Sequence, residues 1–169
     1  MKFEHIENRE GAEIYEEEFS WENEPGKSDE AQTLADEKLK ALGWPEGQAF
    51  AFSEAVHEAV DNAIVHGNLN VNRKDGSDDY PDRIKAAQEA NKEKRVRMYF
   101  RFSKDDATAQ IKDEGGYVPE KLDDPTAGEH VLDGSGRGLY LIFSKVDDVN
   151  FAPGEIIIHK QRKDNEDAP

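Results

Sequence analysis

The amino-acid sequence predicts an α+β fold, a two-layer sandwich in which helices cover one face of a mixed, mostly antiparallel sheet. Residues 95–113 and 146–160 each contain two short strand-like segments joined by a tight turn, which is typical of hairpins. Residues 28–42 and 52–68 repeat apolar side chains at helical spacing along a single stripe, so each helix buries one face. Because strands in hairpins need no crossover connection, we expect mainly antiparallel pairing.

Composition and charge limit the partners that the chain can bind. The 169 residues (19.1 kDa) suit one domain over 1–169, in which about 70% of the unfolded surface could be buried. A formal net charge of −16 disfavours nucleic acid and anionic membranes, because phosphate binding requires a positive surface. The absence of cysteine excludes disulfides and thiolate chemistry. No apolar run suits an export signal or a membrane span, so we expect a cytoplasmic protein.

The N-terminal part predicts one strand and one helix. Residues 12–21 alternate imperfectly, and we expect Ile14 and Phe19 to face the core. The following helix has Ser28 or Asp29 as a candidate N-cap. The segment 12–21 is a candidate edge strand, which leaves open whether a second copy of the chain pairs with it to form a homodimer.

Two hydrophilic stretches are expected outside the core. Residues 69–94 form a hydrophilic insertion, in which 81–94 contain good helix formers but hardly any apolar stripe. A charged stretch of this kind is a solvated face or a contact for a phosphate or a partner. From about residue 161 the chain is expected to be frayed.

The helix predicted over 52–68 carries polar side chains at the border of its apolar face. Glu58 and Asn62 lie one turn apart, with His66 a further turn along, so the carboxylate and the carboxamide can converge on one ligand. The amide oxygen of Asn62 suits a hydrated Mg²⁺ that bridges triphosphate oxygens. Glu58 could orient or deprotonate a nearby hydroxyl or water. Alone, this spacing is also common on wet helix faces.

Two glycine-containing turns supply the remaining chemistry. Asp113 ends the first hairpin and precedes Gly115 and Gly116, so its carboxylate could accept from the amine of adenine while the glycines let backbone approach the base. The run 134–138 leads directly into an apolar helix, and its backbone N–H groups suit a phosphate chain. Each motif alone also fits an ordinary loop. Their order along the chain favours a nucleotide site.

The motifs EAVDNAIVHGN, DEGG and GSGRGLYLI resemble the N-box and the two glycine boxes of the ATPase superfamily shared by gyrase, mismatch-repair proteins, bacterial chaperones and histidine kinases. The likeness is strongest to stand-alone anti-sigma factor serine/threonine kinases. It implies a Bergerat-like sandwich that binds ATP and Mg²⁺ beneath a lid at 118–135. It also implies a small antagonist-like protein as substrate, a sigma-factor-like partner, and a homodimer.

The resemblance assigns roles to individual residues. Glu58 would be the general base, Asn62 the Mg²⁺ ligand, and Asp113 the adenine acceptor. Gly115 and Gly116 would shape the base pocket. The residues that would cradle the phosphates follow as a group: Ser135, Gly136, Arg137, Gly138 and Leu139.

The first glycine box differs from the usual D-x-G-x-G pattern, because Tyr117 follows Gly116 directly. This difference keeps other hypotheses open. One is a non-catalytic switch in which ATP changes affinity for a partner. Others are an ATPase or histidine-kinase-like module without a phosphoacceptor domain, and an acidic protein-binding module that has lost nucleotide binding.

Overall fold

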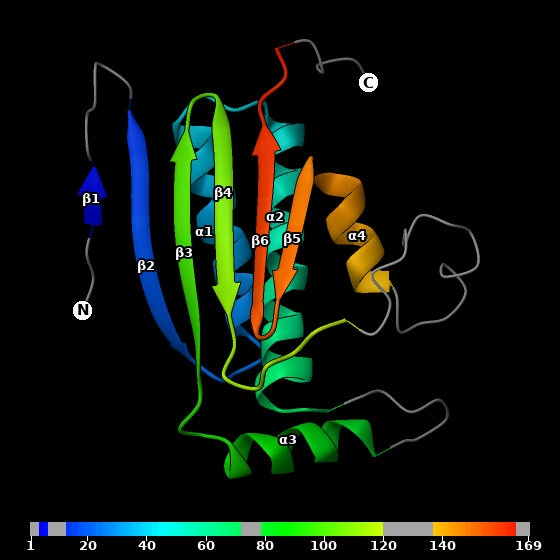
Figure 1. Ribbon diagram of the computed structural model, residues 1–169. Coiled ribbons are helices and arrows are strands. Elements are labelled where there is room, and N and C mark those ends of the chain that lie inside the picture. Colours follow the sequence, from blue (N-terminus) through cyan, green and yellow to red (C-terminus); the bar gives the residue numbers. More distant parts are fainter. Residues whose placement is uncertain (1–3, 7–12, 72–78, 120–136, 165–169) are drawn as a thin grey trace.

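A six-stranded sheet and a layer of helices form the two layers of the protein (Figure 1). The structure is a computed structural model that describes residues 4–6, 13–71, 79–119 and 137–164. The strands are β1 (Glu4–Ile6), β2 (Ile14–Glu22), β3 (Arg95–Ser103), β4 (Asp106–Lys112), β5 (Asp148–Ala152) and β6 (Glu155–Gln161), in the order β1-β2-β3-β4-β6-β5. The helical segments are α1 (Lys27–Ala41), α2 (Glu46–Asn62), the π-helix η1 (Ala63–Asn68), α3 (Tyr80–Ala90) and α4 (Arg137–Lys145).

The α+β sandwich predicted from the sequence is confirmed. Figure 1 shows α1, α2 and α4 on one face of the sheet, while α3 runs across one of its ends. Both hairpins form, as β3–β4 and β5–β6. Every described strand pair is antiparallel, so the sheet is not mixed. Within the described ranges, no helix is long and apolar enough to cross a bilayer.

Aromatic residues of β3 form the centre of the core. Phe100 and Phe102 are fully buried, and they lie opposite the small residues Ala109 and Ala107 of β4. Small residues on the neighbouring strand leave room for the rings, which stack with centroids 5.2 Å apart. The ring of Phe52 on α2 packs edge-to-face with the ring of Phe102, and their centroids lie 5.7 Å apart. This cluster fixes α2 against the sheet, and α2 carries the candidate base and metal ligand.

The N-terminal strand corrects two expectations. Phe19 is buried as predicted, but Ile14 is only half-buried, and Tyr15 faces the core instead. Side chains alternate across a strand, so residues 14 and 19, an odd number apart, cannot share a face. β2 is also not an edge strand, because it pairs with β1 on one side and with β3 on the other.

The predicted N-cap of α1 was wrong. The cap position is Gly26, and no side chain bonds the first turn. Ser28 Oγ donates instead to the carbonyl of Pro25 at 2.8 Å. Asp29 lies in the first turn, where a carboxylate favours the positive end of the helix dipole, and its side chain contacts α2.

The helix predicted over 52–68 begins earlier, at Glu46, and changes type at Ala63. In η1 the hydrogen bonds span five residues, as when the Leu69 N–H donates to the carbonyl of Ile64 at 2.8 Å. The wider turn lets both Ile64 and Val65 point inward, whereas α-helical spacing places Val65 on the open side. The π-helix begins directly after Asn62, next to the candidate site.

The hydrophilic stretch after η1 contains α3, which has no buried residue. Tyr80, Ile84 and Ala87 lie at helical spacing and pack partly against the core. This weak apolar contact holds α3 across the end of the sheet that carries the β4 terminus (Figure 1).

Candidate functional site

A pocket opens between α2 and the C-terminal strands. It is a shallow, open pocket with about 280 Å³ of space between and around its lining atoms, open solvent included. Apolar residues form its floor, and Asn62, Asp113 and Glu155 supply polar groups around it. The full lining is Ala59, Asn62, Ala63, Ile111, Asp113, Tyr117, Phe151, Glu155 and Ile156. An apolar pocket with a few polar groups is the usual form of a small-molecule site.

Asp113 organises the turn that follows β4. Its Oδ1 accepts the backbone N–H groups of Gly115, Gly116 and Tyr117 at 2.8, 2.7 and 3.3 Å. Its own N–H donates to the carbonyl of Gly154 at 2.9 Å, which ties the turn to the β5–β6 hairpin. Because the three N–H groups converge on Oδ1, the second carboxylate oxygen is left to accept from a ligand in the pocket.

Glycines allow this turn to pack against η1. A Cβ on Gly67 would lie 2.5 Å from Cγ of Asp113, and one on Gly115 would lie 1.9 Å from the carbonyl oxygen of Gly67. Both distances are shorter than atoms tolerate, so any side chain here would push the turn away from the helix. The N-box helix and the first glycine box, far apart in sequence, are therefore in direct contact.

Asn68 joins the same elements, and the sequence reasoning assigned it no role. Its side chain is fully buried, with Nδ2 donating to the carbonyl of Arg95 at 3.0 Å. Its Oδ1 accepts the N–H of Glu114 at 2.7 Å. One carboxamide thus holds the end of η1 to the start of β3 and to the glycine turn. In the sequence, Asn68 is the last residue of the predicted helix, and an asparagine at a helix terminus is ordinary and gives no sign of these contacts.

The N-terminus of α4 lies against Glu58 and Asn62. A Cβ on Gly138 would lie 2.7 Å from Oε2 of Glu58 and 3.7 Å from both amide atoms of Asn62. At the other end of α4, Lys145 Nζ lies 3.2 Å from Oε2 of Glu54 on α2. Two contacts therefore fix α4 along α2. A helix N-terminus beside a carboxylate and a carboxamide can hold an anion and a cation together.

The structure places some of the other predicted phosphate-binding residues. Ser135 and Gly136 lie outside the described residues, as does the lid beyond Pro119. The backbone of Arg137 begins α4, and Leu139 packs partly against the core. The described part of the cradle is therefore the first turn of α4.

Histidine and carboxylate side chains cluster beside the site. His57 Nε2 lies 3.1 Å from Oδ1 of Asp29, and its Nδ1 lies 3.8 Å from Oε1 of Glu58. Glu58, followed by Asp29 and Asp61, raises the pKa of His57 above its usual value against the opposing effect of burial. Burial raises the pKa of Asp61.

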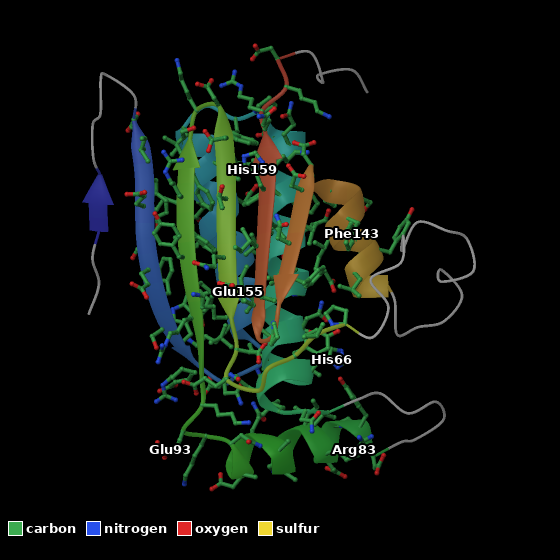
Figure 2. All side chains as sticks on the ribbon, in the orientation of Figure 1. His66, Arg83, Glu93, Phe143, Glu155 and His159 are labelled. Carbon is green, nitrogen blue, oxygen red and sulfur yellow. The ribbon has the colours of Figure 1, made fainter. Side chains whose placement is uncertain are left out.

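Tyr117 lines the pocket, and its ring lies against the ring of His66. Their rings stack with centroids 5.5 Å apart and planes inclined by 27°. Figure 2 shows His66 beside the chain that follows β4, at the same end of the sheet as the β5–β6 turn. Tyr117, the residue at which the first glycine box departs from the usual pattern, thus lines the pocket and contacts η1.

Residues 83–159 match the family model of the histidine kinase-like ATPase domain. This stretch is therefore similar to a histidine kinase-like ATPase domain. The antiparallel sheet covered by helices on one face is consistent with the Bergerat-type fold of that family, whose domains bind ATP. No curated protein matches the chain.

The matched stretch runs from α3 through β6, so Glu58 and Asn62 lie before it in the sequence. The tertiary contacts join the two parts. Gly138 of the matched stretch abuts Glu58 and Asn62, and Asp113 abuts Gly67. The helix that carries Glu58 and Asn62 therefore packs directly against the matched stretch.

The residues at the site suit a magnesium nucleotide. Within the described ranges, no group of three or more His, Asp or Glu side chains could hold a metal by itself. A single amide oxygen, as at Asn62, suits Mg²⁺, which keeps several waters and takes its other ligands from phosphates. The space that a Cβ of Gly138 would fill lies between this amide and the first turn of α4.

Proposed function

We propose that the protein is an ATP-binding regulatory kinase that transfers phosphate to a serine or threonine of a small antagonist-like protein. One observation carries the proposal: Gly138 brings the start of α4 against Glu58 and Asn62. A phosphate at this helix N-terminus would lie beside a metal ligand and a carboxylate base, which are the parts that phosphoryl transfer requires.

Each polar group at the site has a role in this proposal. Asn62 would hold Mg²⁺, which would neutralise charge on the phosphate oxygens. Asp113 accepts from the amine of adenine through the oxygen that the turn leaves open. Gly115 and Gly116 bring backbone close to the base. Residues 135–139 supply N–H groups to the phosphates.

Glu58 acts as the general base. Its carboxylate accepts the proton of the substrate hydroxyl as that oxygen forms a bond to the γ-phosphorus. The bond between the γ-phosphorus and the bridging oxygen breaks, and ADP leaves with that electron pair. Oε2 of Glu58 faces the first turn of α4, where the γ-phosphate would be held.

The proposed protein partners are an antagonist-like substrate and a sigma-factor-like protein. The net charge of −16 favours basic surfaces on such partners, because opposite charges speed association. A homodimer is also proposed. With β2 inside the sheet, the edges available for pairing are β1 and β5.

A non-catalytic, ATP-dependent switch is the second candidate. Tyr117 occupies the place where the usual motif has its second glycine, and it lines the pocket. Its ring narrows the space beside Asp113 in which a base and sugar would lie. A site that binds ATP in a shifted position could order the chain around it without transferring phosphate.

Two measurements separate these candidates. Calorimetry with ATP and Mg²⁺ tests binding, and labelled γ-phosphate tests transfer to candidate protein substrates. Binding with transfer supports the kinase, and Glu58→Ala should then abolish transfer while it largely keeps binding. Binding without transfer to any cognate protein leaves the switch. No binding at millimolar ATP refutes both candidates and leaves an acidic protein-binding module.

A further inference from the structure

His57 connects two carboxylates that come from different helices. Its Nε2 lies 3.1 Å from Oδ1 of Asp29, in the first turn of α1, and its Nδ1 lies 3.8 Å from Oε1 of Glu58 on α2. The imidazole is half-buried, with 29% of its side chain exposed, whereas the side chain of Asp29 is 79% exposed. The ring therefore lies in the seam between the helices, close to the proposed base.

The contact between His57 and Glu58 is unusual for neighbours on a helix. Successive residues point about 100° apart, so their side chains do not normally face each other. Here the imidazole and the carboxylate turn toward each other across this angle. Asp29 lies at the opposite nitrogen of the ring, and its 3.1 Å contact with Nε2 is compatible with Nδ1 facing Glu58.

The two oxygens of Glu58 have different neighbours. Oε1 faces His57 Nδ1, while Oε2 faces the position that a Cβ of Gly138 would occupy, 2.7 Å away. If Oε1 is held by the imidazole, the carboxylate plane is fixed and Oε2 is the oxygen presented at the start of α4. A base works best when it is held in such a productive geometry.

We propose that His57, braced by Asp29, is a positioning residue that orients Glu58 so that Oε2 points at the reacting hydroxyl. This inference rests on the proposed function, in which Glu58 is the base. His57 itself touches neither the nucleotide nor the hydroxyl. Its effect should therefore appear in the rate of transfer and not in the affinity for ATP.

The charge state of the ring decides whether both contacts form. An imidazolium donates from both nitrogens, whereas a neutral ring donates from one only. The charged groups that act on His57 in the described residues are Glu58 and Asp61 of α2 and Asp29 of α1, and together they raise its pKa. At higher pH the neutral ring donates from one nitrogen only, and the 3.8 Å contact of Nδ1 with Glu58 should be lost in favour of the 3.1 Å contact of Nε2 with Asp29, so Glu58 loses its orientation.

The test compares His57→Ala and His57→Gln with the unaltered full chain in phosphate transfer from ATP to its protein substrate. We expect kcat to fall about 100-fold in His57→Ala and less in His57→Gln, with KM for ATP unchanged within about twofold. Asp29→Asn provides a second variant at an exposed position and should lower kcat about threefold to tenfold. His159→Gln is the matched control, since His159 is 30% exposed, lies near Asp148 and is on β6 away from the pocket (Figure 2).

The pH profile provides a readout that loss of folding would not produce. In the unaltered protein kcat should decline at alkaline pH as His57 loses its proton, although a carboxylate base alone would give no such decline. His57→Ala should lack this alkaline decline. In NMR titrations, which need no activity, Asp29→Asn and Glu58→Gln should each lower the pKa of His57.

The outcomes separate the inference from the proposed function. If the unaltered protein binds ATP but transfers no phosphate, both the kinase function and the inference are overturned. If it transfers phosphate and His57→Ala keeps its kcat and its alkaline decline, only the inference fails. It also fails if the pKa of His57 is unchanged in Glu58→Gln, because the two side chains would then not interact.

Discussion

Gly138 lies so close to Glu58 that a methyl group on its Cα would come 2.7 Å from Oε2 of the carboxylate. This contact joins the second glycine box to the N-box helix. It makes a sharp prediction, because the atom that would have to move is the end of the proposed catalytic side chain. The substitution should therefore disturb the site more than it disturbs the fold.

Gly138→Ala should lower ATP–Mg²⁺ affinity about tenfold or more, because the carboxylate of Glu58 would have to move and the new methyl group would lie 3.7 Å from the amide of Asn62. The melting temperature should stay level or rise, since alanine favours a helix over glycine by up to about 1 kcal/mol. Calorimetry and thermal unfolding measure the two effects. Gly47→Ala is the matched control, because a Cβ there meets nothing within 4 Å. Equal ATP affinity in both variants would refute the proposed contact.

Asp113→Asn should weaken ATP binding without unfolding the turn. The amide oxygen of asparagine can still accept the N–H groups of Gly115 and Gly116, so the turn that follows β4 keeps these hydrogen bonds. The NH₂ group of the asparagine would then face the amine of adenine, and because both groups are hydrogen-bond donors, no hydrogen bond could form between them. We expect a loss of about 10–100-fold in affinity, since an unpaired polar group costs roughly 1–3 kcal/mol. Calorimetry with ATP and with GTP measures it, and an unchanged preference for ATP would contradict the role of Asp113.

Asn68→Ala should destabilise the whole domain. It would leave the carbonyl of Arg95 and the N–H of Glu114 without their partner, in a site where Asn68 is fully buried. The expected cost is about 2–4 kcal/mol in the free energy of unfolding, measured with urea. Asn91→Ala is the control, because it removes a single bond to Ala87 at the end of the exposed helix α3. A similar small decrease in the free energy of unfolding in both variants would show that Asn68 does not hold η1 to β3 and to the glycine turn.

His57 should also make stability depend on pH. Its folded pKa is raised above the unfolded value near 6.5, so its contacts stabilise fully below that value. The contribution is lost as the pH rises through the higher folded pKa. The unaltered protein should therefore exceed His57→Gln in unfolding free energy by more at pH 5.5 than at pH 9. Urea unfolding at the two pH values measures this difference, and the reverse order would contradict the assigned charge contacts.

Local pattern was sufficient for most of the elements. The alternation of residues 95–103 puts Val96, Met98, Phe100 and Phe102 on one face, and all four are buried, because the period of two is a local property of a strand. The imperfect alternation of β2 led to the wrong face being predicted for Ile14, because the inner face of that strand carries the buried polar residue Glu17. The π-helix could not be predicted, because its wider turn has no distinctive residue pattern.

In the candidate site too, some residues could be predicted from the sequence and others could not. Residue types and their order predicted Glu58, Asn62 and Asp113, whose roles remain to be tested. The sequence could not indicate Asn68, whose partners Arg95 and Glu114 are 27 and 46 residues away. Nor could it indicate that His57 bridges Asp29 and Glu58, because that contact depends on how α1 packs against α2.

The sequence alone determined an α+β domain with an amphipathic helix that carries Glu58 and Asn62, two hairpins, and a glycine turn at 115–116. Those features depend on periodicity and turn chemistry, which act over a few residues. Only the tertiary structure decided that Gly138 abuts Glu58, that Gly67 abuts Asp113, and that Asn68 clamps the end of η1. The reason is physical: these contacts form when the sheet and the helix layer close on a shared core, and close packing fixes atoms that are far apart in the chain.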